Sequence, residues 1–191
     1  LRPGQRLLDI GCGWGGLILH AARHYGVDAT GITLSEAQAE LATRRIREED
    51  LADRCRVFLR DYRELDEEEG FDALVSVGMF EHVGAEMLQT YFRQALRLLR
   101  PCGVFLNHGI AYSATNRLEP GPGFIDTYVF PDGELEGVGA IVSAMQNSGF
   151  EVRHEENLRE HYGRTLHAWC DNLTAHWEDA VNEVGVGRER V

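Results

Sequence analysis

LLDIGCGWGGL, at residues 7–17, joins a short apolar run to a cluster of glycines, and a helical pattern of apolar residues follows it. A short apolar run that ends in glycines is typical of a buried strand followed by a tight turn. Glycines in such a turn let a ligand approach the backbone closely, and the start of the next helix offers free N–H groups. The stretch therefore predicts a strand, a turn and a helix that together can bind a polar or anionic group.

Strand and helix patterns alternate along the rest of the chain. Further strands are predicted at residues 27–32, 56–60, 73–77, 104–108 and 150–155. Helices are predicted at residues 35–50, 87–99 and 138–148, and from Tyr162 onward. The run RPCG at residues 100–103 predicts a turn between the helix and the strand beside it. Alternating elements of this kind predict an α/β fold, a doubly wound, mostly parallel Rossmann-like sheet with helices on both faces.

Length and charge narrow the possible functions. The chain has 191 residues, enough for one core, so residues 1–191 are predicted to form a single domain. A formal net charge of -12 opposes broad electrostatic binding to nucleic acid. No apolar run approaches the roughly 20 residues that span a bilayer, and no signal peptide is visible, so a cytoplasmic location is expected. The scattered cysteines, and the absence of any His, Asp or Glu cluster with ligand spacing, predict no metal site.

The glycine turn matches only part of the dinucleotide-binding pattern. Gly11, Gly13 and Gly16 have the spacing G-x-G-x-x-G, and Gly15 adds a further glycine to the turn. The second strand ends in Thr33 rather than in the acid that would bind an adenosine ribose. A nicotinamide cofactor is therefore disfavoured, and a tight turn without any ligand remains an alternative explanation of the glycines.

Six sequence strings, in a fixed order, resemble one enzyme family. They are LLDIGCGWGGL, GITLSEAQ, SVGMFEHVG, the H-x-I of His108 to Ile110, FIDTYVFPDG and HYGRTLHAW. Together they resemble the cyclopropane-fatty-acid synthase and mycolic-acid methyltransferase family, from about Leu7 to Trp169. The glycine loop alone would indicate only a methyltransferase. The combination of MFEHVG, H-x-I and HYGRTL makes the resemblance specific.

The resemblance implies that S-adenosylmethionine (SAM) lies over the glycine loop. The loop residues implied to contact SAM are Asp9, Gly11, Cys12, Gly13, Trp14 and Gly15. Thr33, Leu34 and Gln38 are implied to reach the ribose, and Tyr62 to flank the adenine. Ser35 and Gln38 also match a helix capping box, and one amide cannot fully serve both roles. For Tyr62 the alternative is an aromatic lid over the core.

The chemistry of the reacting side follows from the sulfonium of SAM. Its methyl group is electrophilic, and methyl addition to an alkene leaves a carbocation that must be stabilised and then deprotonated. The resemblance implies a bicarbonate ion as the base, held by Glu81, His108, the main chain of Ile110, and Tyr162. Each of the three side chains has a structural alternative. Glu81 could favour a helix N-terminus, His108 could be a core histidine, and Tyr162 could pack on its own helix.

The resemblance implies transfer of a methylene or methyl group to the cis double bond of unsaturated phospholipid acyl chains. The enzyme is then expected to work peripherally, at the inner face of the membrane. One alternative is a SAM-dependent methyltransferase acting on a small amine, or on a fatty-acyl chain without ring closure. Another is a module that binds SAM or lipid without turnover.

The family has a segment before the glycine loop that closes over SAM, and an antiparallel edge strand after the last helix. Neither is matched between Leu1 and Val191. The chain is therefore expected to be a fragment that turns over more slowly than its full-length parent, because water quenches a carbocation in an open site.

Overall fold

The computed structural model describes residues 1–66, 69–112 and 135–185. Its strands are β1 (Arg6–Ile10), β2 (Asp28–Thr33), β3 (Cys55–Leu59), β4 (Phe71–Val77) and β5 (Leu99–His108). Its helices are α1 (Gly16–Tyr25), α2 (Glu36–Glu48), α3 (Leu88–Leu98), α4 (Val138–Asn147), α5 (Arg159–Ala175) and α6 (Trp177–Val184). Three short 3-10 helices accompany them: η1 (Tyr62–Glu64), η2 (Phe80–His82) and η3 (Ala85–Met87).

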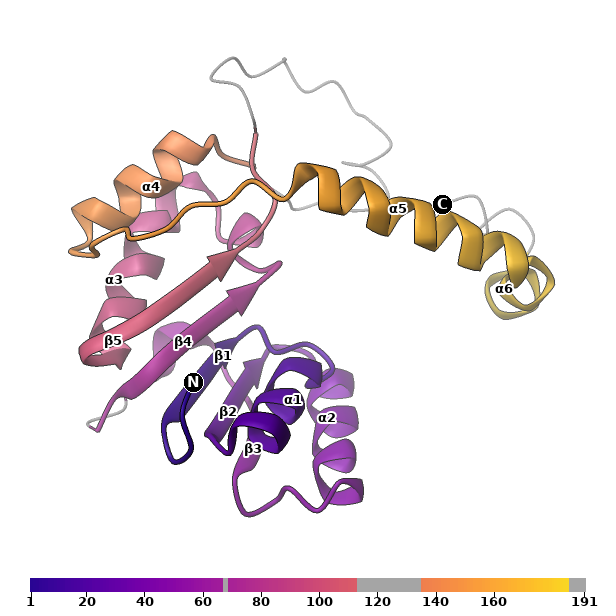
Figure 1. Ribbon diagram of the computed structural model, residues 1–191, viewed down its shortest axis with the longest axis horizontal. Coiled ribbons are helices and arrows are strands. Elements are labelled where there is room, and N and C mark those ends of the chain that lie inside the picture. Colours follow the sequence, from indigo (N-terminus) through magenta and orange to yellow (C-terminus); the bar gives the residue numbers. More distant parts are fainter. Residues whose placement is uncertain (67–68, 113–134, 186–191) are drawn as a thin grey trace. The chain divides into compact units, whose positions relative to one another are not determined.

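The five strands form one sheet in the order β3-β2-β1-β4-β5, and all neighbouring strands are parallel (Figure 1). The predicted doubly wound α/β fold is therefore confirmed. Ile10 pairs with Ile32, and Val77 pairs with His108, so the strands end level with one another. Because all the strands run the same way, the segments that follow them meet at one edge of the sheet, where ligands bind in folds of this kind.

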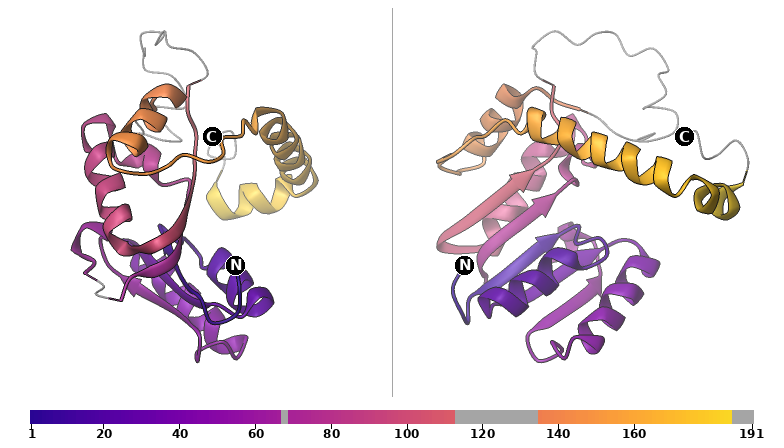
Figure 2. Two further views of the ribbon diagram at one scale, coloured as in Figure 1. Left: turned by 60° about the vertical axis from the view of Figure 1, so that its left-hand side comes forward. Right: turned by 45° about the vertical axis from the view of Figure 1, so that its right-hand side comes forward.

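Each face of the sheet has its own apolar core, and Figures 1 and 2 show α1 and α2 on one face and α3 and α4 on the other. On the α3 side, the fully buried members include Leu8, Leu74, Tyr91, Phe92 and Leu98. On the α1 side, the buried members include Leu7, Ile18, Val27, Ala29 and Ile46. Burial of a large apolar side chain contributes about 1.5–3 kcal/mol, so these two clusters fix the helices against the sheet.

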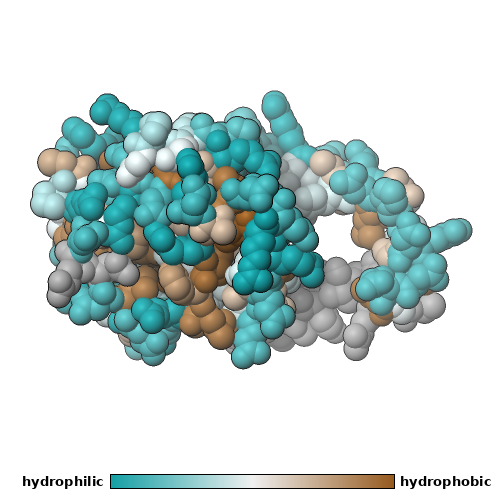
Figure 3. All heavy atoms as spheres, turned by 90° about the horizontal axis from the view of Figure 1, so that it is seen from below, coloured by the Kyte–Doolittle hydropathy of each residue, from teal (hydrophilic) through white to brown (hydrophobic). Residues whose placement is uncertain are grey.

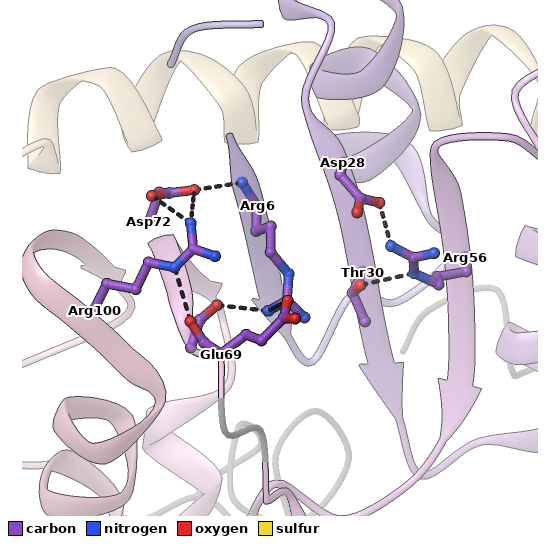
Figure 4. A network of polar contacts seen from close by, with 8 residues as sticks. Arg6, Asp28, Thr30, Arg56, Glu69, Asp72 and Arg100 are labelled. Atoms are coloured by element: carbon purple, nitrogen blue, oxygen red, sulfur yellow. Dashed lines mark hydrogen bonds and ion pairs between the residues drawn. The ribbon is translucent and has the colours of Figure 1, made fainter. Parts of the chain in front are cut away.

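An ion-pair network stands at the amino ends of the strands, at the opposite edge from the segments that follow them (Figure 4). The Asp72 carboxylate accepts hydrogen bonds from the Arg6 backbone N–H at 2.7 Å and from the Arg100 guanidinium at 2.9 Å. The Arg6 N–H, followed by Arg100, lowers the pKa of Asp72. Arg56 pairs with Asp28 on the neighbouring strands. The network joins β1 to β4 and β5, and we assign it a structural role.

The predicted strand at residues 150–155 is wrong, since residues 150–157 form neither strand nor helix. The Phe150 ring lies 5.7 Å from that of Phe105 and 6.4 Å from that of Phe92. The apolar character of this position therefore reflects a single anchor in the core, while the residues from Arg153 to Asn157 are exposed.

The predicted turn at residues 100–103 is also corrected. Strand β5 begins at Leu99, directly after α3, and the pairing with β4 shifts register between Phe71 and Ala73. Cys102 has a φ of 64°, and a Cβ on Gly103 would stand 3.2 Å from the Asp72 carbonyl oxygen. These turn-forming residues therefore make an irregularity within the paired strand.

The chain divides into two compact units, Leu1–Leu118 with Gly133–Glu151, and Glu119–Asp132 with Val152–Val191. The first unit holds the sheet and α1 to α4, and the second holds α5 and α6. A single domain over residues 1–191 stays a prediction.

Large apolar side chains remain exposed in both units, and Figure 3 shows a strip of apolar residues among hydrophilic ones. Within the described ranges, no helix has the length and apolar character needed to cross a membrane.

Candidate functional site

The glycine loop is tied to the end of the neighbouring strand. The backbone N–H groups of Gly11 and Cys12 both donate to the Ile32 carbonyl oxygen, at 3.0 and 2.9 Å. Gly11, Gly13 and Gly15 have φ angles of 83°, 53° and 82°, a region that favours glycine. Helix α1 begins after Gly15 without a side-chain cap. The N–H groups of its first turn are therefore available to a ligand.

The three loop glycines have different neighbours. A Cβ on Gly11 would lie 2.8 Å from Met79 Cγ, and one on Gly15 would lie 2.8 Å from Ala42 Cβ. A Cβ on Gly13 would meet no atom within 4 Å. Close packing therefore accounts for Gly11 and Gly15 without a ligand. Gly13 instead presents bare backbone to open space, which is what close approach of a ligand requires.

Asp9 and Cys12 are buried, while the Trp14 side chain is exposed. Burial raises the pKa of the Asp9 carboxyl to about 7. Burial, followed by the Asp9 charge, raises the pKa of the Cys12 thiol to about 12. Cys12 therefore remains a neutral thiol at physiological pH and is not a nucleophile. Contact of these three residues with SAM stays a prediction.

Asp9→Asn is expected to flatten the dependence of stability on pH. The pKa of Asp9 rises on folding from 3.8 to about 7, so the folded state holds more protons across that interval, and the free energy of unfolding falls as pH rises through it. The loss amounts to about 2–3 kcal/mol between roughly pH 5 and pH 8. Urea unfolding of both proteins across this range measures it. If the free energy of unfolding changed with pH in the same way in both proteins, the raised pKa of Asp9 would be contradicted.

At the end of β2, a short hydrogen-bond chain shows how Gln38 can take part in helix capping and still have an amide group for the predicted ribose contact. The Thr33 hydroxyl donates to Gln38 Oε1 at 2.6 Å, and the Ser35 N–H donates to Thr33 Oγ1 at 3.2 Å. The Gln38 N–H donates to Ser35 Oγ at 3.3 Å. Only half of the predicted capping box forms, because Thr33 takes the Ser35 N–H. The Gln38 amide nitrogen makes no hydrogen bond with the residues that the structure describes, and Leu34 is exposed.

Tyr62 follows β3 in η1 and is half-buried. Its ring meets that of Tyr91 edge-on, with 5.4 Å between the ring centroids, and burial raises the pKa of its hydroxyl. The Gln94 amide donates to the Tyr62 carbonyl oxygen at 3.0 Å. These contacts support the core-lid interpretation. The predicted contact with adenine would need the exposed part of the ring.

Glu81 is the most unusual group at the strand ends. Its side chain is 4% exposed, yet Oε2 has no hydrogen-bond partner among the described residues. Oε1 accepts a 3.4 Å hydrogen bond from the Ile110 N–H, across 29 positions of sequence. η2 has only three residues, which is too short for a substantial helix dipole. A buried carboxylate oxygen without a protein partner is costly unless an ordered water, a ligand or a reacting group supplies the missing hydrogen bond.

Gly109 is a site residue that the sequence analysis missed. A Cβ at this position would stand 2.2 Å from Phe80 Cε1 and 2.6 Å from Glu81 Oε2. A bare backbone at 109 therefore allows Glu81 to lie against the end of β5. Gly109 is the middle residue of the H-x-I string, but the sequence does not show that the Glu81 side chain packs against it.

Gly109→Ala is expected to displace the Glu81 carboxylate and to destabilise the fold by about 1–3 kcal/mol, the usual cost of overpacking. Turnover should fall with little change in SAM affinity. Thermal unfolding and calorimetry measure the two effects. Gly137→Ala is a matched control, because a Cβ at Gly137 would meet nothing within 4 Å. Wild-type stability and turnover in the 109 variant would contradict the proposed crowding.

His108 and Tyr162 lie in different surroundings. His108 is exposed at the end of β5, so its alternative as a core histidine is wrong. Tyr162 lies on α5 in the second unit, where its ring is 6.1 Å from that of Trp169. That contact supports packing along its own helix. Its participation in a site with Glu81 stays a prediction.

Beneath the strand ends lies a buried polar group that the sequence did not predict. The Tyr91 hydroxyl donates to Asn107 Oδ1 at 3.0 Å, and burial raises the pKa of Tyr91. Ser76, which pairs with Asn107 in the sheet register, is fully buried, and its hydroxyl lies near that of Tyr91. The Tyr91 bond holds the strand residue immediately before His108.

Comparison with known proteins gives one consistent result. The chain matches the family model described as mycolic acid cyclopropane synthetase over residues 1–190. A probable fatty acid methyltransferase of Mycobacterium tuberculosis is 47% identical over 191 residues, covering 100% of this chain and 44% of that protein. The cyclopropane-fatty-acyl-phospholipid synthase of Escherichia coli is 40% identical over 183 residues, covering 95% of this chain and 45% of that protein. The chain thus spans just under half the length of these curated relatives.

A solved structure extends the likeness to three dimensions. The mycolic acid cyclopropane synthase CmaA1, in complex with SAH and CTAB, matches with a TM-score of 0.89 at 32% sequence identity. The match covers 100% of this chain and 70% of that one.

Proposed function

We propose that this chain, which belongs to the mycolic acid cyclopropane synthetase family, binds SAM and transfers its methyl carbon to the cis double bond of unsaturated phospholipid acyl chains. The observation that carries the proposal is the buried Glu81 carboxylate, with one oxygen unpartnered, at the same sheet edge as the open backbone of Gly13. A methyltransferase acting on an alkene needs both features, a close cofactor cradle and a negative group for the cation.

The residues around the glycine loop fit SAM. Gly13 leaves room for a ligand against the backbone, and the uncapped start of α1 offers N–H groups to a carboxylate. The Gln38 amide nitrogen, not used in the capping box, suits a ribose hydroxyl. CmaA1, a relative with the same fold, was solved with SAH. When bound, SAM supplies an electrophilic methyl carbon.

Glu81 supplies the two functions that the substrate side requires. Its carboxylate stabilises positive charge on the alkylated acyl chain, in surroundings where burial strengthens electrostatic attraction. Its free Oε2 accepts a proton, or a hydrogen bond from a group that carries the proton away. The Ile110 N–H fixes Oε1, so Oε2 is the oxygen available for these roles.

A bicarbonate ion fits beside Glu81 in one respect, because the O–H of bicarbonate can donate to Oε2. The Ile110 N–H, expected to contact the ion, donates to Glu81 instead. We propose that bicarbonate contacts Glu81 and His108. Activity should then fall when dissolved carbon dioxide is stripped from the buffer and return when bicarbonate is added.

Methyl branching without ring closure is a second candidate product. It is favoured by the 47% identity to a probable fatty acid methyltransferase. The difference lies in which proton leaves the carbocation. Loss from the new methyl group closes a cyclopropane, and loss from a neighbouring chain carbon leaves a methylated alkene.

Lipid mass spectrometry tests the proposal and separates the two products. Cells that express the protein should gain one CH2 on unsaturated phospholipid acyl chains. Ring protons in the NMR spectrum of the extracted lipids would identify a cyclopropane, and retained vinyl protons would identify the branched alkene. Unchanged lipids, in cells containing folded protein that binds SAM, would overturn the proposed substrate.

A further inference from the structure

A hollow on the surface of the first unit is lined almost entirely by hydrogen-bond donors. Its volume is about 350 Å³, and its lining residues are Arg63, Thr90, Arg93, Gln94 and Arg97. Four of them lie on α3 at spacings of three and four residues, so they share one face of that helix. Arg63 comes from η1, which directly precedes the segment leading to β4. In a chain of net charge -12, three guanidinium groups around one hollow form a local exception.

The acids beside this hollow leave its positive charge only partly compensated. Arg63 pairs with Asp61 at 2.6 Å, and Arg97 pairs with Asp66 at 2.6 Å. The Asp66 side chain is 82% exposed, and exposed ion pairs contribute little, so a competing anion can replace Asp66 at small cost. Asp61 is 15% exposed and holds Arg63 through two guanidinium nitrogens, so that pair is expected to persist. Arg93 is exposed and makes no ion pair or hydrogen bond with the described residues.

Gln94 makes the hollow a fixed structure rather than a chance group of mobile side chains. Its amide nitrogen donates to the carbonyl oxygens of Tyr62 and Leu65, at 3.0 and 2.9 Å. Its Oε1 accepts from Arg97 Nε at 3.0 Å. Arg97 is therefore oriented before any ligand arrives, which lowers the entropy lost on binding.

We propose that this hollow binds the phosphate of an anionic phospholipid headgroup and so holds the first unit at the membrane surface. Guanidinium groups match phosphate oxygens in paired, charge-assisted hydrogen bonds, and Thr90 adds a hydroxyl donor. Lipid is the favoured source of phosphate, because the proposed acyl substrate is part of a phospholipid. The choice of a lipid phosphate therefore rests on the proposed function.

Vesicle sedimentation tests the inference without relying on turnover. The protein should bind phosphatidylglycerol vesicles more tightly than phosphatidylcholine vesicles at the same ionic strength. R93Q/R97Q should weaken binding to phosphatidylglycerol by about 10- to 30-fold. R44Q/R47Q removes the same charge from exposed positions on α2 and should change binding less than threefold. Because Arg97 also bonds to the Leu65 carbonyl, R93Q alone serves as a variant whose fold is not at risk.

Four outcomes are decisive. Equal losses in the two double variants would show that only overall charge matters, and no loss in R93Q would show that Arg93 does not contact the headgroup. Either result would overturn the inference. Inorganic phosphate that binds wild type in calorimetry, with vesicle binding unaffected by R93Q/R97Q, would assign the hollow to a free phosphate ester instead. Arginine-dependent binding to phosphatidylglycerol would support the headgroup site even if the acyl chains are not methylated, so failure of the proposed function would be separately visible.

Discussion

Glu81→Gln is expected to lower the turnover number by about 10²- to 10⁴-fold, the range for loss of an acid–base group or an electrostatic stabiliser. The substitution keeps the size of the side chain and one acceptor oxygen for the Ile110 N–H. It removes the negative charge that opposes the cation, and the basic oxygen at Oε2. SAM affinity should change by less than about threefold, because the interaction is made in the transition state.

The measurement pairs two assays on the same preparations. Calorimetry gives the dissociation constant for SAM, and methyl incorporation into unsaturated phospholipid gives turnover. Glu86→Gln is a suitable control, because Glu86 is exposed and lies only five positions along the chain. Intact turnover in Glu81→Gln, or a loss confined to SAM affinity, would remove Glu81 from the reacting side.

Gly13→Val is expected to weaken SAM binding by more than about 100-fold. Gly13 has a φ of 53°, which a β-branched residue adopts only with strain, and its Cβ would enter the open space where the cofactor is proposed to lie. Backbone strain and steric overlap with the cofactor both weaken binding. A 100-fold rise in the dissociation constant corresponds to about 2.7 kcal/mol of binding free energy. Calorimetric titration with SAM and with SAH measures it.

Gly4→Val separates the two causes. Gly4 has a φ of 80°, and a Cβ there would also meet nothing within 4 Å, but it precedes β1 at the opposite edge of the sheet. The control should lose stability from backbone strain and keep its SAM affinity. Equal affinities in all three proteins would show that the glycine loop is only a tight turn.

The limits of the sequence analysis are clearest at Gln38 and Glu81. The sequence predicted a capping box and a ribose contact for Gln38, but a capping pattern cannot show that Thr33 would take the Ser35 N–H and leave the Gln38 amide nitrogen free. For Glu81, position after an apolar strand predicted the correct sheet edge. Its unpartnered oxygen depends on Phe80, Gly109 and Ile110, which pack around it in three dimensions.

The sequence by itself determined the parallel α/β sheet, the strand-to-helix turn at the glycines, and the edge of the sheet at which the glycine loop, Glu81 and His108 lie. These properties follow from local patterns and from the order of elements, because parallel strands must all end at one side. The tertiary structure alone decided the burial of Asp9, the crossing of Glu81 over Gly109, and the arginine-lined hollow beside α3. Each of these depends on contacts between residues far apart in sequence, whose distances are set only when both faces of the sheet are packed.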